Sequence, residues 1–398
     1  MNLTGKHLVL GLSGGIACYK AAELLRGLTK AGASVQVVMT EAARHFITPV
    51  TMQALSGKPV YTDQWDARIS NNMAHIDLTR NADAIVIAPC SADFMRKLVH
   101  GAADDLLSTL CLARPASLPL LVAPAMNVEM WDNPATQRNV AQLREDGVTL
   151  LGPVAGEQAC GETGLGRMME PEDLLEAILA FFQPKRLQGK RVLITAGPTF
   201  EPIDPVRGIT NLSSGKMGYA LARAARAAGA DVTLVSGPTA LPRPQGVTLL
   251  PVTTARDMHE AVMSQVAGQH VFIAVAAVAD WRVANASEQK LKKQDGALPQ
   301  LAFEPNPDIL ATVAALPDDG KRPYCVGFAA ESENLLEHGA AKRKKKNIPL
   351  LVGNIGHQTF GKDDNELVLF DDAGHHALPR ASKDALAALL VAEIANRL

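Results

Sequence analysis

One pattern constrains the fold more than any other: short apolar runs that alternate with helix-length segments. The run His7–Leu12 is followed by a glycine turn, by the helical segment Ala17–Leu28 and by a second apolar run, Val35–Met39. This order predicts a β-α-β unit. Further apolar runs follow at helix-length intervals, at 84–88, 118–122 and 148–151. Apolar strands separated by helices indicate a parallel sheet that is covered by helices on both faces.

The same pattern restarts in the second half of the chain. The apolar run Arg191–Thr195 leads into a Gly-Pro turn, and the helical segment Ala220–Ala227 closes at Gly229 before the run Val232–Val235. Glycine commonly ends a helix in this way. We expect further strands at 247–252, 270–277, 324–327 and 350–353, an edge strand at 367–370 and a capped helix at 382–397. The predicted fold class is α/β, with two doubly wound, mainly parallel-sheet, Rossmann-like domains.

Length and composition set the broad class of protein. The chain has 398 residues, enough for two domains with separate cores, which we expect at 1–183 and 191–398 with a linker at 184–190. A hydrophobic fraction of 47% excludes a disordered chain, and a net charge of -2 gives no basic surplus for nucleic acid or an anionic membrane as the main partner. No apolar run reaches the ~20 residues that span a bilayer.

The cysteines and the N-terminus predict a cytoplasmic protein. The five cysteines are scattered and never spaced as CxxC, so neither a disulfide framework nor a zinc site is expected. The first residues run directly into a strand and lack the features of a secretory signal.

Candidate site residues of the first half follow the predicted strands. The turn Ser13-Gly14-Gly15 offers backbone amides to a phosphate at a helix N-terminus, although a full GxGxxG is absent. Thr40, Ser91 and Asp93 follow later strands at the same sheet edge, where ligands bind in open α/β folds. His75 lies in a short amphipathic segment, where a structural role is the more common one.

Two segments of the first half are more specific. Ala123–Trp131 contains Met126 and Asn127. Asn127 could take part in a site, or it could only cap the helix that follows. Cys160 lies in Gln158–Met168, whose three glycines predict an Ω-like flap. A thiol on such a flap could reach a ligand and exclude water, whereas the other cysteines lie in apolar surroundings and are expected to be buried.

Together these motifs resemble those of the flavin-dependent cysteine decarboxylases. They are Ser13–Ala17, the His75 segment, Pro124–Asn127, Met130-Trp131 and Ala159–Gly161. The whole chain is similar, in order, to the bacterial coenzyme A biosynthesis family in which a phosphopantothenoylcysteine decarboxylase is fused to a phosphopantothenate-cysteine ligase. The resemblance implies a homo-oligomeric cysteine decarboxylase fold followed by a CTP-dependent ligase fold.

For the first half, the resemblance implies FMN as a temporary electron sink, because direct loss of CO2 would leave an unstabilised carbanion. Oxidation of the substrate thiol to a thioaldehyde allows decarboxylation to an enethiolate, and reduced FMN then returns the hydride. His75 would assist oxidation and decarboxylation, Asn127 would bind the departing carboxylate and Cys160 would donate the last proton. The implied cofactor-binding residues are Ser13, Gly14, Gly15, Thr40, Ser91, Asp93, Ser108 and Met126.

The second half contains several polar loops. Ser213–Lys216 resembles the end of a Walker A loop, but Thr210 replaces its leading glycine and Met217 its hydroxyl residue, so no Walker A loop is predicted. The segment 274–281 is predicted to be a strand that ends in the acid Asp280. The run Lys342–Lys346 could be a solvated helix face, a nucleic-acid patch or a phosphate site.

For the second half, the resemblance implies that CTP converts 4'-phosphopantothenate to an acyl-cytidylate, which the cysteine amine attacks. Residues implied around the nucleotide are Ala274, Val275, Ala276, Asp280, Asn306, Pro307, Asp308, Ile309 and Phe328. Lys290, Lys342 and Lys346 would face the phosphates, with Lys290 counted as catalytic, and Asn211 would hold the acyl-cytidylate. Mg2+ would accompany CTP, through ligands that the sequence leaves unknown.

Two other classes of function remain open at this point. One is a flavin- or NAD-dependent oxidoreductase with a regulatory nucleotide domain, disfavoured because the dinucleotide fingerprint is absent. The other is a non-enzymatic nucleic-acid binder, which only the lysine run favours. The resemblance instead implies the small-molecule substrates 4'-phosphopantothenate, L-cysteine and CTP, with no nucleic-acid or membrane partner. It also implies trimers of the flavin domain and dimers of the ligase domain, which together make a dodecamer.

Overall fold

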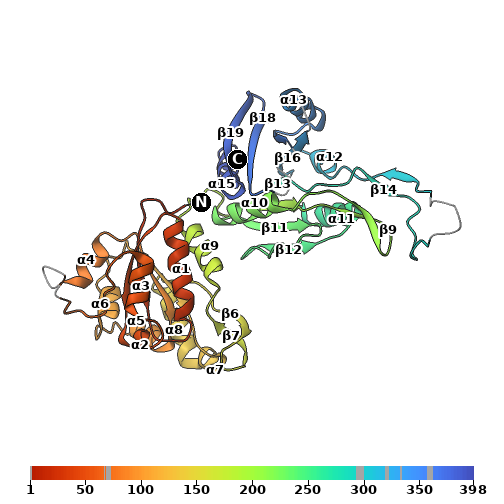
Figure 1. Cartoon of the computed structure of the whole chain (residues 1–398). Helices are drawn as coiled ribbons and strands as arrows, with labels where there is room; N and C mark the ends of the chain where they lie inside the picture. Colours follow the sequence, from red (N-terminus) through yellow and green to blue (C-terminus); the bar gives the residue numbers. More distant parts are fainter. Residues whose placement is uncertain are drawn as a thin grey trace. The chain divides into compact units, whose positions relative to one another are not determined.

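The computed structural model describes residues 2–66, 68, 73–292, 300–318, 322–331, 334–355 and 362–398. The chain forms two compact units, Asn2–Phe182 and Gln183–Leu398, each with its own sheet and cores (Figure 1). Within the described ranges, every helix is too short or too polar to cross a membrane.

The first unit alternates strands with helices. Its elements are β1 (His7–Leu12), α1 (Cys18–Lys30), β2 (Ser34–Met39), α2 (Glu41–Arg44), α3 (Pro49–Ser56), α4 (Ala74–Arg80), β3 (Ala84–Cys90), α5 (Ala92–Val99), α6 (Leu106–Leu112), β4 (Leu120–Pro124), α7 (Val128–Asp132), α8 (Pro134–Glu145), β5 (Thr149–Leu150), β6 (Val154–Glu157), β7 (Thr163–Arg167) and α9 (Pro171–Phe181). In the described part of this unit, five parallel strands form a sheet in the order β2-β1-β3-β4-β5. The order reverses between β1 and β3, which is the switch point where such sheets bind ligands.

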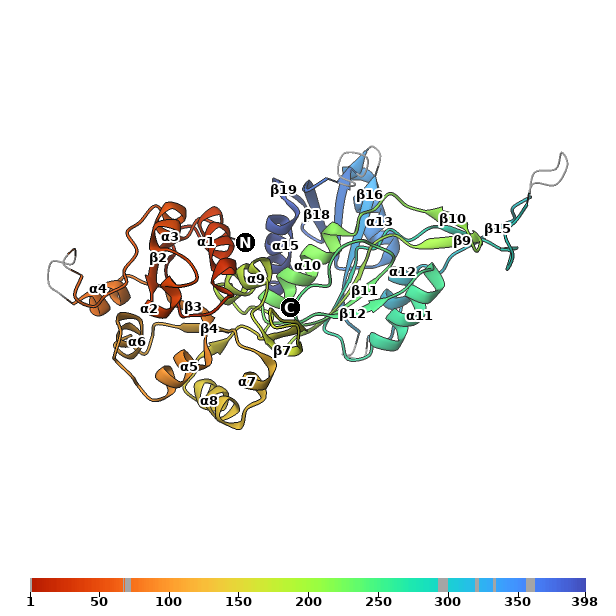
Figure 2. The ribbon, with the colours of Figure 1, turned by 60° about the horizontal axis from the view of Figure 1, so that its bottom comes forward.

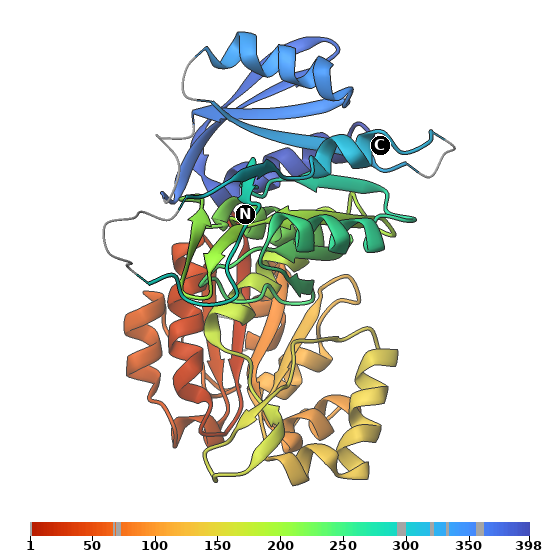
Figure 3. The ribbon, with the colours of Figure 1, turned by 90° about the vertical axis from the view of Figure 1, so that its right-hand side faces the viewer.

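Alternate residues of the central strands are buried on opposite faces of this sheet. Leu8 and Leu10 of β1 belong to a core that includes α1 and α9, whereas Val9 belongs to a second core that includes α5 and α6. Figure 3 shows helices on both sides of the strands, red on one side and orange to gold on the other. Because both faces are covered, the strands are continuous apolar runs in the sequence.

The second unit is built in the same way, with additions at one edge. Its elements are β8 (Arg191–Ala196), β9 (Phe200–Asp204), β10 (Arg207–Thr210), α10 (Lys216–Ala227), β11 (Asp231–Ser236), β12 (Thr248–Pro251), α11 (Ala255–Gln265), β13 (Val271–Ala274), β14 (Trp281–Val283), β15 (Phe303–Pro305), α12 (Ile309–Ala314), β16 (Tyr324–Glu331), α13 (Leu335–Lys346), β17 (Leu350–Ile355), β18 (Asp364–Asp371), β19 (Gly374–Ser382) and α15 (Lys383–Ala395). Over the described residues, the sheet order is β12-β11-β8-β13-β16-β17-β18-β19.

Most of this sheet is parallel, and its last two strands are antiparallel. The prediction of an edge strand at 367–370 is wrong in position, because these residues lie in β18, which pairs with β17 on one side and β19 on the other. The edge strand is β19, whose side chains are mostly exposed. It carries no apolar run, so no hydrophobic periodicity marks it as a strand.

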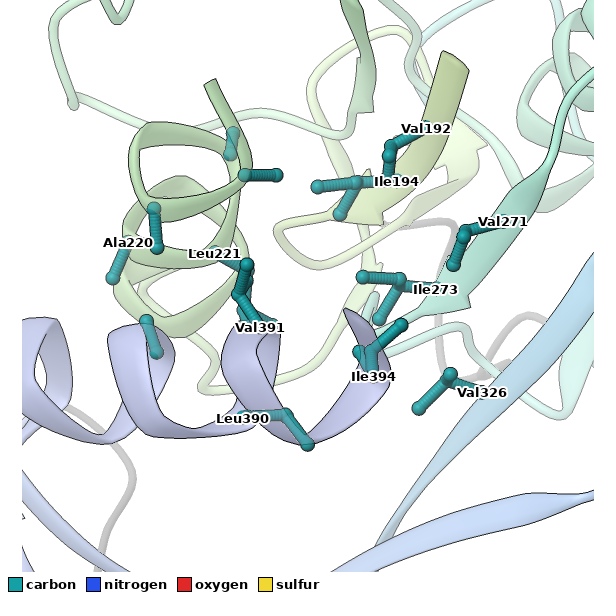
Figure 4. Packing of buried hydrophobic residues seen from close by; sticks show 14 of the residues in the cluster. Val192, Ile194, Ala220, Leu221, Val271, Ile273, Val326, Leu390, Val391 and Ile394 are labelled. Carbon is teal, nitrogen blue, oxygen red and sulfur yellow. The ribbon is translucent and has the colours of Figure 1, made fainter. Parts of the chain in front are cut away.

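Two helices cover one face of the second sheet. Figure 4 shows Leu221 of α10 and Val391 and Ile394 of α15 directed toward Ile194 and Ile273 on the strands. All five side chains are at most 3% exposed, and burial of each such side chain stabilises the fold by about 1.5–3 kcal/mol. Ser382 caps α15 by accepting a hydrogen bond from the Ala385 amide, as the predicted capped helix requires.

Two antiparallel pairs, β9-β10 and β14-β15, form an arm that extends from the second unit (Figure 2). Because β13 ends at Ala274, the predicted strand at 270–277 is shorter in the structure, and the predicted strand at 274–281 is wrong except at its two ends, Ala274 in β13 and Trp281 in β14. Beyond that point, the Thr195 hydroxyl accepts hydrogen bonds from the Val275 and Ala276 amides at 3.2 and 3.3 Å. A side chain thus replaces the strand ladder, and the residues before Asp280 form a loop.

Candidate functional site

The turn after β1 in the first unit is joined to the loop after β3 by one buried hydroxyl. Ser13 Oγ donates to the Pro89 carbonyl at 2.9 Å and accepts from the Ser91 amide at 2.8 Å. Gly14 fits closely against α2, because a Cβ there would lie 2.6 Å from Ala42 Cβ, whereas Gly15 faces open space. The backbone of this turn is therefore accessible at the switch point.

The other predicted cofactor-binding side chains of the first unit make local bonds. Thr40 and Ser91 cap α2 and α5, each accepting a backbone hydrogen bond at 3.2 Å. Ser108 forms a capping box with Asp105 at the start of α6, and Asp93 is exposed and paired with Arg96. Among the described residues, no side chain caps α1. The Cys18 and Lys20 amides bond to the Gly15 and Ala17 carbonyls, and the helix start without a side-chain cap is suited to an anion through its dipole and the backbone of the preceding turn.

Asn127 caps a helix, which is the alternative role that the sequence offered, and its side-chain amide also bonds a carboxylate of this chain. Its Oδ1 accepts a hydrogen bond from the Met130 amide at 2.9 Å and so caps α7, while its Nδ2 donates to Glu162 Oε2 at 2.6 Å. The neighbouring Met126 donates its amide to the Gly166 carbonyl at 3.0 Å and packs against the core. The cap fixes the amide group, so Nδ2 points away from the helix.

The segment that carries Cys160 is a β-hairpin, β6-β7, and the predicted Ω-like flap is corrected accordingly. The hairpin lies on the Asn127 loop so closely that a Cβ at Gly166 would be 2.5 Å from the Met126 carbonyl oxygen. Cys160 is exposed in its turn, with Sγ 3.5 Å from Glu162 Oε2. Asn127 and Cys160 are therefore brought together on one edge of the first unit.

The other four cysteines are buried, as predicted. Burial raises the pKa of Cys18 and of Cys325 to about 11 and that of Cys111 to about 12. The pKa of Cys90 is also raised, by burial and by the neighbouring Cys111. These thiols are small apolar core groups, in contrast to Cys160.

His75 lies elsewhere in the first unit. It is half-buried at the start of α4, which packs against α6. Figures 1 and 2 both show α4 at the opposite end of this unit from α7 and the β6-β7 hairpin. A single chain does not bring His75 together with Asn127 and Cys160.

The second unit contains a cavity of about 520 Å³ at the carboxyl ends of β8, β13 and β16. It gathers every predicted nucleotide-site residue of this half except Lys290. The predicted residues that line it are Asn211, Ala274, Val275, Ala276, Asp280, Asn306, Pro307, Asp308, Ile309, Phe328, Lys342 and Lys346. These residues come from segments far apart in the sequence, so their convergence is a property of the fold.

Asparagine amides hold the loop that forms one wall of this cavity. Asn211 Nδ2 donates to the Ala277 carbonyl and Asn306 Nδ2 to the Ala279 carbonyl, both at 2.9 Å. The wall between them consists of small side chains. A flat ring can therefore approach the backbone of this loop.

Lysines on α13 supply positive charge to the cavity. Lys346 forms an ion pair with Asp308, and Lys342 Nζ lies 3.6 Å from Glu331 Oε1. Burial alone would raise the pKa of Asp308, but the bond from Lys346 and the amide of Ala311 outweigh it and hold the pKa below its ordinary value. The carboxylate is thus ionised, and Lys346 keeps a charged partner.

Lys290 lies on the arm, with an exposed side chain, outside the described lining of the cavity. The adjacent Leu291 donates its amide to Asp204 Oδ2 at 3.1 Å. Asp204 also accepts from the amides of Val206 and Arg207. The segment that carries Lys290 is therefore anchored to the β9-β10 turn.

The structure adds cavity residues that sequence reasoning missed. They are Ser213, Ser214, Lys216, Asn354, Asn365 and Lys383. The first three lie at the start of α10, which begins at Lys216 and not at the predicted residue 220. Their Ser-Ser-Gly-Lys pattern is a usable sequence signal for this site, although it does not complete a Walker A loop. Asn354 follows a predicted strand, whereas nothing in the sequence pointed to Asn365 or Lys383.

Within the described ranges, no group of three or more His, Cys, Asp or Glu side chains is arranged to hold a metal ion. Two doubly wound units, each with polar groups gathered at the carboxyl edge of its sheet, define a two-domain α/β protein of the nucleotide-binding class.

Comparison with known proteins identifies the family. Residues 1–183 match the family described as Flavoprotein, and residues 187–398 match the DNA/pantothenate metabolism flavoprotein C-terminal domain. The coenzyme A biosynthesis bifunctional protein CoaBC of Vibrio cholerae serotype O1 is 50% identical over 394 residues, which cover 98% of each chain. That of Escherichia coli (strain K12) is 47% identical over 403 residues, which cover 100% of this chain and 98% of the relative.

A crystal structure is known for the C-terminal domain of the coenzyme A biosynthesis bifunctional protein CoaBC. Its sequence is 39% identical to this chain, and the match covers 54% of this chain and 97% of that chain, with a TM-score of 0.46. The chain belongs to the family of bifunctional coenzyme A biosynthesis proteins. This confirms the predicted family and the assignment to an enzyme with a flavoprotein decarboxylase half and a ligase half.

Proposed function

We propose that the second unit joins cysteine to 4'-phosphopantothenate at the expense of CTP, and that the first unit decarboxylates the product to 4'-phosphopantetheine with FMN. The observation that carries this proposal is the convergence of the predicted nucleotide residues on one cavity. A carboxylate has no good leaving group, and cytidylylation supplies one. The two units would therefore catalyse consecutive reactions.

The first unit fits FMN at its switch point. The uncapped start of α1 and the accessible backbone at Gly15 would hold the phosphate, beside the loops that Ser13 joins. FMN would supply reversible two-electron oxidation of the substrate thiol, which the side chains of this chain do not provide. The Flavoprotein family match over this unit supports the assignment.

Asn127 and Cys160 would act on the substrate from one side. Asn127 Nδ2, fixed by the cap that Oδ1 makes to α7, would donate a hydrogen bond to the substrate carboxylate. The hairpin would cover the substrate and exclude water, and the Cys160 thiol in its turn would donate the proton that completes reduction. The exposed free thiol also supports a reducing, cytoplasmic location.

His75 would reach the site from a second copy of the chain. It lies on α4, apart from Asn127 and Cys160 within one chain. If His75 assists oxidation and decarboxylation, the site must form where two copies meet. This supports the expected trimer of the first unit, which dimers of the second unit would link into a dodecamer.

In the second unit, the small-residue wall would take the cytosine ring, and the lysines would neutralise the triphosphate. Lys342 and Lys346 on α13 and Lys216 at the start of α10 all line the cavity, so attack at the α-phosphate would be assisted by charge neutralisation and positioning. Asn211 would hold the acyl group. Mg2+ would be bound by the phosphate oxygens, and the carboxylates of this chain that line the site are those of Asp280 and Asp308.

The test uses the full-length purified chain. We expect flavin absorbance from the bound cofactor, and pyrophosphate release that requires CTP, 4'-phosphopantothenate and cysteine together. Lys290→Gln should abolish pyrophosphate release and leave the decarboxylase working, whereas the exposed neighbour Lys292→Gln should behave as wild type. A colourless protein that is indifferent to CTP would refute both assignments, and full turnover of Lys290→Gln would refute the role of that charge.

A further inference from the structure

One carboxylate oxygen in the first unit lies between the two residues that the proposed function assigns to the substrate. Glu162 Oε2 accepts a hydrogen bond from Asn127 Nδ2 at 2.6 Å and lies 3.5 Å from Cys160 Sγ. Asn127 is on the loop before α7 and Cys160 is in the turn of the hairpin. Glu162 therefore links the proposed carboxylate-binding group to the proposed proton donor.

The turn that carries Cys160 and Glu162 is closed by its own backbone. The Gln158 amide donates to the Glu162 carbonyl at 2.8 Å, and the Gly161 amide donates to the Gln158 carbonyl at 2.9 Å. Because these bonds lie within the turn, Cys160 and Glu162 move together. A change in the contact that Glu162 makes will therefore also move the thiol.

Two side chains of this turn bind the loop of Asn127. Gln158 Oε1 accepts from the Val128 amide at 3.0 Å, and Glu162 accepts from the Asn127 amide group. The first contact is between neutral groups, and the second is charge-assisted and so the stronger of the two. The Glu162 contact is also the one that a bound substrate would disturb.

We propose that Glu162 is a positioning residue that occupies the amide of Asn127 when no substrate carboxylate is there. The substrate carboxylate displaces it on binding, and Glu162 returns once CO2 has left. Its return brings the Cys160 thiol to the reacting carbon, so proton donation follows decarboxylation. This inference rests on the proposed roles of Asn127 and Cys160.

The order of events follows from charge. Asn127 Nδ2 carries two N–H groups, but a second carboxylate beside the first is disfavoured because the two negative charges repel each other at short distance. CO2 is neutral and does not compete for the amide. The position of Glu162 therefore depends on whether the carboxylate is still attached to the substrate, and premature protonation is avoided.

The test compares Glu162→Gln with Glu162→Asp and with Glu157→Gln. Glu157 is an exposed glutamate on the same hairpin, outside the proposed site, and serves as the matched control. Mass analysis gives the ratio of unsaturated enethiol to saturated product, and hydrogen exchange of residues 158–165 without substrate reports on the turn. Both measurements use the full-length flavin-loaded protein.

For Glu162→Gln we expect the enethiol ratio and the exchange rate of the turn each to rise about tenfold, because a neutral amide replaces a charge-assisted acceptor. The KM for the substrate should fall, because the competing carboxylate is gone. Glu162→Asp keeps the charge and should recover part of the wild-type ratio, and Glu157→Gln should match wild type in every measurement.

The outcomes separate this inference from the proposed function. A wild-type product ratio and wild-type exchange in Glu162→Gln would overturn the role of Glu162, and so would loss of CO2 release, which would place Glu162 before decarboxylation. Cys160→Ser tests the proposed function on its own, since it should release CO2 and accumulate the enethiol. Saturated product from Cys160→Ser would overturn the proposed function, whatever Glu162→Gln does.

Discussion

The Ser13 hydroxyl accepts the backbone amide of Ser91 at 2.8 Å and joins the loops that follow β1 and β3. The same hydroxyl donates to the Pro89 carbonyl at 2.9 Å, and Ser13 is only 2% exposed. Water cannot easily replace a buried hydroxyl of this kind. Together with the backbone bond from the Ser13 amide to the Pro89 carbonyl at 3.2 Å, this side chain fixes the relative position of the two loops at the switch point.

Ser13→Ala should lower the free energy of unfolding by about 1–3 kcal/mol, because it leaves the Ser91 amide without its acceptor, while the Pro89 carbonyl keeps the Ser13 amide at 3.2 Å. It should also lower the amount of flavin retained per chain. Ser91→Ala is the control: it removes the α5 cap, worth about 1 kcal/mol, but keeps the backbone amide that Ser13 binds. Denaturant titration and flavin absorbance measure the two effects. Equal flavin retention in both variants would contradict the role given to Ser13.

Thiol alkylation should distinguish Cys160 from the other cysteines. Burial raises the pKa of Cys18 and Cys325 to about 11, so at pH 8 about one part in a thousand of each is thiolate. A raised thiol pKa favours the neutral form, and reactivity of these groups should increase only as the pH approaches that value. Iodoacetamide at pH 8 should add one group per native chain, and Cys160→Ser should remove it. A rapid second adduct in mass spectra would contradict this assignment.

The strands of both units were predictable from the sequence because their side chains are buried on both faces. After an exposed first residue, the segments 7–12 and 191–195 are buried, mostly apolar runs, and each strand has a neighbour on both sides in its sheet. Local patterns also revealed the segments of Asn127 and Cys160. Contacts between segments could not be predicted, such as the packing of the β6-β7 hairpin against the Asn127 loop.

The cavity of the second unit is another place where contacts between distant segments could not be predicted from the sequence. Lys216, Asn354 and Lys383 lie on three separate elements, and only the fold brings them to one surface. Glu162 was overlooked although it is two residues from Cys160, because an exposed glutamate in a turn carries no signal until its partner is known. Side-chain contacts at long sequence separation are decided by packing and not by periodicity.

Lys346→Gln should raise the KM for CTP about 10- to 100-fold, because it removes a charge-assisted bond to a phosphate worth about 1.5–3 kcal/mol. Lys345 is the matched control, since it is exposed on the same helix and is outside the described lining of the cavity. Lys345→Gln should change the KM less than twofold. Steady-state pyrophosphate release at varied CTP measures both, and equal effects would indicate that only the overall charge of α13 matters.

Mixed oligomers should decide where His75 acts. His75→Ala and Asn127→Ala should each lose formation of the saturated product when made alone, and this product is the activity measured in every mixture. If His75 serves the site of a neighbouring copy, co-expression of the two variants should restore about a quarter of the activity, because random assembly pairs the two intact halves at that frequency. The control is Asn127→Ala with Cys160→Ser. These residues lie on the same chain, joined through Glu162, so no mixture of the two variants can rebuild a complete site. Recovery in the first mixture and none in the second requires a site shared between copies. No recovery in either mixture would place His75 in the site of its own chain or outside the reaction.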